Sequence, residues 1–184
     1  MAISLLSVTQ ISALSTTVIQ NLTVTEIATL SASQVGAINT SGIAVIDATQ
    51  LAALSTTQVR GLTGTQISGF QSNLVFSTNQ LLVLNSQQFG SLTSSQLDSF
   101  DETHIAVISA TQLAALSTTN FSSLDATQIG ALNSTQIAGI TATEIRNLTT
   151  TDVSEFRATQ LGALSVTQLR SFTPTNLSAL DATQ

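Results

Sequence analysis

The residues best suited to chemistry lie in one segment, LDSFDETH, at residues 97–104. Its last residue, His104, is the one histidine of the chain. A histidine acts as a general base when a nucleophile or a carboxylate is held next to it, and acidic side chains bind divalent cations when they follow the spacing of a cation-binding loop. The acidic residues here, Asp98, Asp101 and Glu102, do not follow that spacing. A weak cation site is therefore the less favoured hypothesis, and we expect Asp101 to cap a helix.

His104 occupies a position that holds glutamine in most of the repeated units described below, so we interpret it as a surface replacement for glutamine. A hydrolase needs a positioned nucleophile and a base, and a single histidine among regular repeats provides neither. The sequence therefore predicts a chain that is not an enzyme. We predict no catalytic, cofactor-binding or metal-binding residues, and no cofactor.

The composition argues against several classes of partner. Only 8% of the residues are charged, against roughly 25% in ordinary globular proteins. The net charge is −6, lysine is absent, and the four arginines are scattered: Arg60, Arg146, Arg157 and Arg170. A nucleic-acid surface needs clustered basic side chains, and a membrane span needs roughly 18 consecutive apolar residues. We therefore expect no nucleic-acid binding and no membrane insertion, and the lack of cysteine excludes disulfides.

An eight-residue repeat runs through the sequence. The first units begin at Ser7, Ser15, Thr23, Ser31, Asn39, Asp47, Ser55 and Thr63. A six-residue unit, QSNLVF, follows at 71–76, and octads then continue from residue 77 to residue 180. We predict one continuous solenoid over residues 1–184, with this irregular unit inside it. The incomplete units at both ends favour a segment of a longer array.

Each position of the consensus (S/T/D/N)-x-T-Q-(I/L/V)-x-x-(L/I/F) has a physical meaning. The first residue, at the cap position, belongs to the four best helix N-caps. The fourth residue, at the glutamine position, completes a capping box by returning its side chain to the N–H of the cap. The pairs include Asp47/Gln50, Ser55/Gln58, Asp125/Gln128 and Thr141/Glu144. Pro174 follows the cap Thr173, at the first helical position, where its missing N–H costs nothing.

The fifth and eighth residues, the first and last apolar positions, are three residues apart, as are neighbours on one helix face. Each octad therefore predicts a capped helix of about seven residues. A helix this short is unstable alone, so stacked units must complete each other's cores. We predict an all-α solenoid of very short capped helices, one per octad. We expect phenylalanines such as Phe89 and Phe121 in the core, and the short unit packed around Val75 and Phe76.

Other folds fit the pattern less well. In one long helix the apolar stripe would spiral into solvent, because eight residues at 3.6 per turn do not close. Half-buried strands need alternation of apolar and polar residues. A β-solenoid stays the alternative, because threonine is a weak helix former that favours strands. The number of octads per superhelical turn cannot be read from the sequence.

Two rows of polar residues recur with the repeat. Threonine fills the third position, the threonine position, in 17 units, including Thr49, Thr57, Thr111, Thr127 and Thr159. We expect its methyl group to pack on the next superhelical turn and its hydroxyl to join the capping network; a surface that binds ice or a polymer is the alternative. The glutamines are expected to cap helices, with a ladder of amides between turns as the alternative.

The octads resemble the Thr-x-Gln-Ile-x-x-Leu-Ser tandem repeats of large bacterial secreted or surface proteins of adhesin-like type. The resemblance covers nearly the whole chain and implies a stalk between an anchoring end and a binding end, located outside the cell or on its surface. We therefore expect a non-catalytic spacer or a filament-forming array that associates end to end through its solenoid ends. The alternative function is contact of the threonine rows with ice or polysaccharide.

Overall fold

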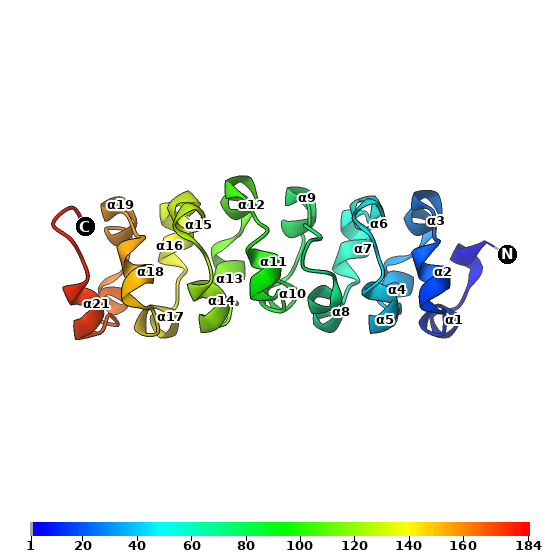
Figure 1. Ribbon diagram of the computed structural model, residues 1–184, viewed down its shortest axis with the longest axis horizontal. Helices are drawn as coiled ribbons and strands as arrows, with labels where there is room; N and C mark the ends of the chain where they lie inside the picture. Colours follow the sequence, from blue (N-terminus) through cyan, green and yellow to red (C-terminus); the bar gives the residue numbers. More distant parts are fainter. Residues whose placement is uncertain (1) are drawn as a thin grey trace.

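The computed structural model describes residues 2–184. In these residues the chain forms 21 short α-helices and one 3₁₀ helix, and no β-strand. The helices follow each other along a rod, with the two termini at opposite ends (Figure 1). The predicted all-α solenoid is therefore confirmed, and the β-solenoid alternative is excluded.

The helices begin and end at similar places in successive octads. Their bounds are η1 (Ile3–Leu5), α1 (Val8–Ser12), α2 (Thr16–Gln20), α3 (Val24–Thr29), α4 (Ala32–Val35), α5 (Thr40–Ile43), α6 (Ala48–Ala53), α7 (Thr56–Arg60), α8 (Gly64–Gly69), α9 (Thr78–Leu81), α10 (Ser86–Gly90), α11 (Ser94–Leu97), α12 (Glu102–Val107), α13 (Ala110–Leu113), α14 (Thr118–Ser122), α15 (Ala126–Ala131), α16 (Ser134–Ala138), α17 (Ala142–Arg146), α18 (Thr150–Ser154), α19 (Ala158–Leu161), α20 (Val166–Leu169) and α21 (Pro174–Ser178).

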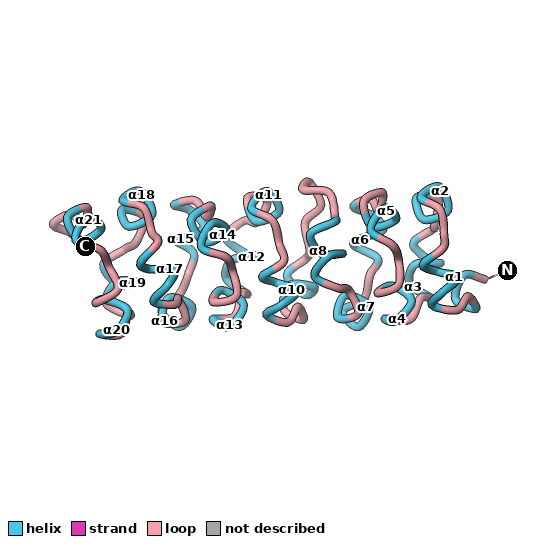
Figure 2. Tube along the Cα trace, turned by 90° about the horizontal axis from the view of Figure 1, so that it is seen from below, coloured by secondary structure: helices cyan, strands magenta, loops and turns pink. Residues whose placement is uncertain are grey.

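Three units make one superhelical turn. Each helix packs on the helix three units later, as α3 does on α6 and α10 on α13. The stacked helices form three columns that follow the rod, and Figure 2 shows the coil from a second side. The first column is α1, α4, α7, α9, α12, α15, α18 and α21; the second is α2, α5, α8, α10, α13, α16 and α19; the third is η1, α3, α6, residues 71–76, α11, α14, α17 and α20.

Caps begin the helices, and a tightened turn ends them. The predicted boxes Asp47/Gln50 and Ser55/Gln58 are both formed, and Pro174 lies in the first turn after its cap, Thr173. In octads such as 55–62 the N–H of the last apolar residue donates to the carbonyl of the first apolar residue, as in Leu62 N to Val59 O at 3.1 Å. This three-residue spacing ends α-helical bonding. The helices are therefore four to six residues long, shorter than the predicted seven.

The core is the row of apolar side chains inside the coil. Both apolar positions are buried, as in Val59 at 0% exposure and Leu62 at 4%, and one continuous cluster extends from Ile3 to Phe172. Phe89 and Phe121 lie in it, as predicted. The small residues between the apolar positions let stacked helices approach each other closely.

The short unit at 71–76 forms no helix. Its chain turns at Leu74, whose N–H donates to Gln71 O at 3.0 Å. Leu74 and Phe76 are buried, whereas Val75 is 37% exposed, so the expected packing around Val75 is wrong. With two residues fewer, Leu74 fills the core in place of Val75. The columns continue across this unit, because α9 stacks on α7 and α10 on α8.

Candidate functional site

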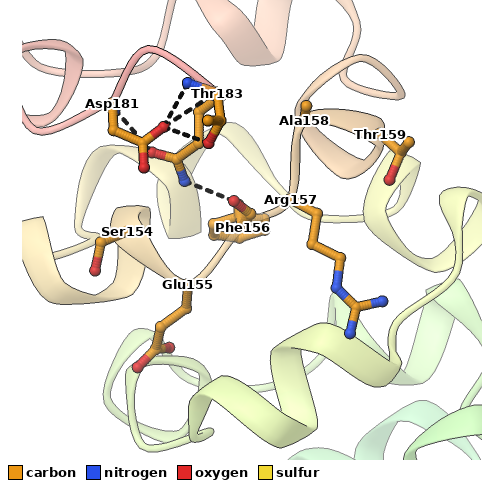
Figure 3. A pocket seen from close by; sticks show the side chains of 9 residues that line it. Ser154, Glu155, Phe156, Arg157, Ala158, Thr159, Asp181 and Thr183 are labelled. Atoms are coloured by element: carbon orange, nitrogen blue, oxygen red, sulfur yellow. Dashed lines mark hydrogen bonds between the residues drawn. The ribbon is translucent and has the colours of Figure 1, made fainter.

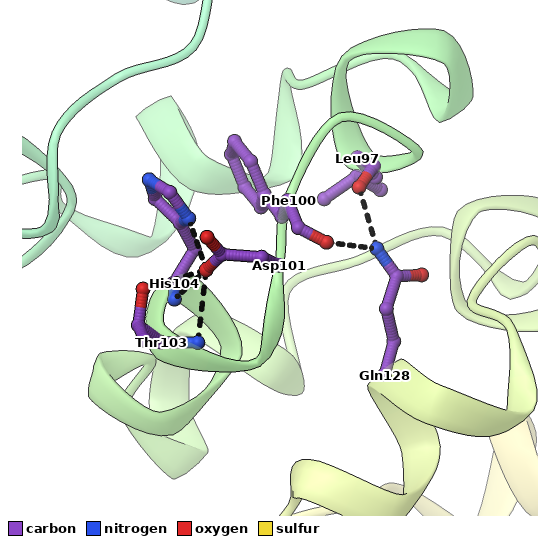
Figure 4. Close-up of polar contacts among 6 residues, drawn as sticks. All are labelled: Leu97, Phe100, Asp101, Thr103, His104 and Gln128. Carbon is purple, nitrogen blue, oxygen red and sulfur yellow. Dashed lines mark hydrogen bonds and ion pairs between the residues drawn. The ribbon is translucent and has the colours of Figure 1, made fainter.

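His104 and Asp101 lie in contact at the start of α12 (Figure 4). His104 Nδ1 lies 2.6 Å from Asp101 Oδ1. The same oxygen accepts the backbone N–H groups of Thr103 and His104, at 2.9 and 3.1 Å. The imidazole stacks on Phe100, with ring centroids 5.5 Å apart, and the side chain is only 17% exposed. Asp101 is therefore a helix cap, as predicted, and His104 takes the glutamine position but is half-buried instead of fully at the surface.

The hydrogen bonds of this group fit capping better than catalysis. The Thr103 hydroxyl donates to Asp101 Oδ1 at 2.6 Å, so this hydroxyl bonds to the carboxylate and not to the imidazole. Hydrogen bonds from the Thr103 side chain and from the backbone and side chain of His104 hold the pKa of Asp101 well below its ordinary value. Within residues 2–184 no three His, Asp or Glu side chains are grouped as metal ligands would be.

An open depression with a volume of about 500 Å³ lies near the C-terminal end, beside α18 and α19 (Figure 3). Its lining includes Glu155, Arg157, Asp181 and Gln184. Asp181 Oδ1 accepts the N–H and hydroxyl of Thr183 and the N–H of Gln184. These bonds form the cap of the next unit and lower the pKa of Asp181. The depression is a surface of the repeat itself, beside a capped turn.

The most regular polar feature is a set of contacts between superhelical turns, made by the glutamine position. Gln128 shows the arrangement: its Oε1 accepts the N–H of Asp125 at 3.0 Å, which completes the capping box. Its Nε2 donates to Leu97 O and Phe100 O, both at 2.8 Å (Figure 4). Phe100 ends the unit four units earlier, where the chain enters the next helix. We call the bond from a side-chain amide to this last-apolar carbonyl an amide rung.

Amide rungs recur along most of the rod. They are made by Gln34, Gln50, Gln58, Gln66, Gln80, Gln88, Gln96, Gln112, Gln128, Gln136, Gln160, Gln168 and Gln184. A rung such as Gln58 to Leu30 reaches 28 residues back, and Gln88 to Leu62, which passes the short unit, reaches 26. The same glutamine side chain therefore does both: its Oε1 caps the helix, and its Nε2 bonds to the turn before it.

Several units replace the glutamine. Asn120 and Asn176 still reach the last apolar carbonyls, Leu92 O at 2.6 Å and Leu148 O at 3.0 Å. Acidic residues stand at the glutamine position in two buried units, as Glu144 and Asp152. Each accepts the N–H of its cap but has no amide N–H to donate.

The threonine row lies on the outside of the rod. Thr49, Thr57, Thr111, Thr127 and Thr159 are all exposed. At this position, within residues 2–184, only Thr103 and Thr183 donate their hydroxyls to a cap, the carboxylates of Asp101 and Asp181. For the rest of the row, the expectation that threonine packs on the next turn and joins the capping network is therefore wrong.

Comparison with known proteins places part of the chain in a repeat class. Residues 105–142 are similar to the ALTTAQ repeat. No curated protein and no solved structure matches the chain. No helix among residues 2–184 has the length and apolar character to span a bilayer. The chain is a repeat array of short helices, and no enzyme family is identified for the matched segment.

Proposed function

We propose that the chain is a structural spacer, a rod that holds two other elements at a set distance. The observation that carries this proposal is the amide rung. Each rung fastens the start of one helix to the turn before it, as Gln58 Nε2 does on Leu30 O at 2.8 Å. Such contacts are buried, and a buried hydrogen bond that loses its partner costs about 1–3 kcal/mol. A rod braced in this way at nearly every unit resists bending and local opening.

The length of the rod tests this proposal. Stacked helices lie about 8–10 Å apart, so removing one superhelical turn, residues 109–132, is expected to shorten the rod by about 8–10 Å. Duplicating the same three octads is expected to lengthen it equally. Small-angle X-ray scattering measures the maximum dimension of each form. A dimension that fails to follow the number of turns, with the fold retained, would contradict the spacer.

An extracellular or cell-surface location belongs to the same proposal. It is supported by the likeness to tandem repeats of secreted adhesin-like proteins and by a composition without cysteine. Brief treatment of intact source cells with a protease is expected to remove the array while a cytoplasmic marker persists. Retention of the array inside the protected fraction would contradict it.

We also propose that the isolated chain associates end to end. Each solenoid end presents a surface that an inner turn would cover. At one end Leu5 is 76% exposed, and at the other Leu177 is 51% exposed. Sedimentation velocity over a concentration series is expected to show a rising mean size. A constant monomer at all concentrations would contradict this association.

The exposed threonines support a second candidate function, binding of ice or polysaccharide. Thr111, Thr135 and Thr159 stand on successive helices of one column, α13, α16 and α19, and all three are exposed. Changing these three to tyrosine is expected to abolish thermal hysteresis or glycan retention. The same change at Thr119, Thr143 and Thr167, an equally exposed row on α14, α17 and α20, distinguishes which row makes the contact. If the unaltered chain has neither activity, this candidate is wrong and the spacer is unaffected.

A further inference from the structure

Glu144 occupies the glutamine position of the unit that contains α17. Its Oε2 accepts the N–H of its cap, Thr141, and Glu144 N–H donates to Thr141 Oγ1 at 3.1 Å. The capping box is therefore complete. The side chain is only 3% exposed, as buried as the glutamines at this position. Half of the glutamine contact, the bond to the cap, is thus preserved.

The other half of the contact is missing. Glu144 Oε1 is buried and has no hydrogen-bond partner among residues 2–184. In the preceding unit Gln136 Nε2 donates to the carbonyls 31 and 28 residues earlier, Ile105 O and Ile108 O, each at 2.7 Å. The same offsets from Glu144 lead to Leu113 and Leu116. An ionised carboxylate oxygen in this place can only accept hydrogen bonds, and so can the carbonyl oxygens of Leu113 and Leu116. A protonated carboxyl oxygen can instead donate to one of them.

Glu26 provides a comparison within the same molecule. It also occupies the glutamine position and also completes a capping box, with Thr23. It lies in the first superhelical turn, is exposed, and has no earlier unit to reach. Hydrogen bonds from Thr23 lower the pKa of Glu26, whereas burial raises the pKa of Glu144 despite the bonds from Thr141. The two sites differ because an earlier superhelical turn covers Glu144, whereas Glu26 is exposed to solvent.

The charged groups around Glu144 are few. Arg146 lies on its own helix, Arg170 ends α20, and Asp152 and Glu155 lie in the next unit. The units of α13, α14 and α16, which face α17 from the preceding turn and along the chain, contain no titratable side chain. None of the four charged groups contributes to the pKa of Glu144, which reflects burial and Thr141 alone. No cation compensates a negative charge at this site.

We propose that Glu144 is a proton-dependent rung. As the neutral acid, its Oε1–H donates to the carbonyl of Leu113 or Leu116 and joins α17 to the turn before it, as a glutamine does. When the proton leaves to solvent, the carboxylate keeps the cap bond but loses the rung. The rod therefore contains a contact that closes as the pH falls, beside amide rungs that do not respond to pH.

The first measurement is the pH at which Glu144 loses its proton. Glutamate occurs at four places, Glu26, Glu102, Glu144 and Glu155. A chain labelled with ¹³C at the glutamate carboxyl carbon therefore gives four signals, which single Glu→Gln changes assign. We expect Glu144 to titrate above 4.5, the ordinary glutamate value, and Glu26 below it. Titration of Glu144 at or below 4.5 would overturn the proposal.

The bond is tested by amide hydrogen exchange of α17 and of residues 113–117, measured across the same pH range and corrected for intrinsic exchange. We expect protection to decrease several-fold as the pH rises through the Glu144 midpoint. Glu144→Gln is expected to make protection high and independent of pH, and Glu26→Gln to leave this region unchanged. A pH response that persists in Glu144→Gln would show that another group causes it, and the proposal would be wrong.

Discussion

Asn39 Nδ2 donates to Leu14 O at 3.1 Å, although Asn39 is a cap residue and the glutamine position of its unit is Gly42. Its Oδ1 meanwhile accepts the N–H of Gly42 at 2.8 Å. Leu14 ends the unit that precedes α2, so its carbonyl is the type that glutamine binds elsewhere. Where glycine removes the rung, the cap side chain therefore makes it.

Asn39→Asp is expected to keep the cap and lose the rung, because a carboxylate accepts the Gly42 N–H but cannot donate to Leu14 O. We expect a loss of about 1–3 kcal/mol in the free energy of unfolding, measured by urea denaturation. The control is Asp47→Asn, since Gln50 already makes the rung of that unit. Equal losses in the two variants would contradict the assignment of a rung to Asn39.

Gln128→Glu is expected to destabilise the rod at neutral pH by about 1–3 kcal/mol. It keeps the bond to the Asp125 N–H but removes the donor to Leu97 O and Phe100 O. The loss should shrink on acidification, when the new side chain regains a proton. Gln10→Glu, in the first turn, is the matched control, and its unfolding free energy is expected to stay within about 0.5 kcal/mol of the parent.

The sequence predicts the local structure well because each octad contains its own signals. Asp47 and Gln50 define a cap and a box without reference to any distant residue. It does not reveal that three units make a turn, because this depends on the angle between successive helices. The acceptor of the rung is not predicted for the same reason, since Leu30, the acceptor for Gln58, lies far away in sequence.

One signal for the rung was nevertheless present. A capping box closes with glutamate as well as with glutamine, yet this chain uses glutamate there only at Glu26 and Glu144. Capping alone does not account for that bias, whereas a required N–H donor does. The threonine row shows the opposite case. Threonine recurs at the same position of the octads, which suggests a structural role, yet residues such as Thr57 are exposed to solvent.

Gly61→Ala is expected to destabilise the rod by about 1–3 kcal/mol, the usual cost of overpacking. A Cβ at this residue would overlap the carbonyl oxygen of Ala32 in the stacked helix α4. Gly69 is the matched control at the same octad position, because its nearest neighbour, Ile43 Cγ2, would lie at an ordinary 3.5 Å. There alanine is expected to stabilise by about 0.5–1 kcal/mol. Thermal denaturation of both variants distinguishes the close approach from a general effect of alanine.

Glu155→Gln is expected to stabilise the rod slightly at neutral pH. Burial, and then the negative charges of Asp152 and Asp125, raise the pKa of Glu155 above its ordinary 4.5. A raised pKa means that the folded chain binds the proton more tightly, so stability falls as the pH rises from about 4.5 through the folded value. The gain should be no more than about 1 kcal/mol after solvent screening, and absent near pH 4. A gain that is equal at pH 4 and pH 7 would exclude this cause.

The amide rung connects units that are four apart, whereas one superhelical turn contains three units. Most octads make the same kind of bond to the octad four before them, so unequal recombination can add or remove a single octad and keep this pairing. The nearly identical blocks at 43–58 and 105–120 illustrate it: α6 lies in the third column and its counterpart α13 in the second. A lineage can therefore adjust the reach of this rod in steps of about 3 Å, a third of the spacing between stacked helices.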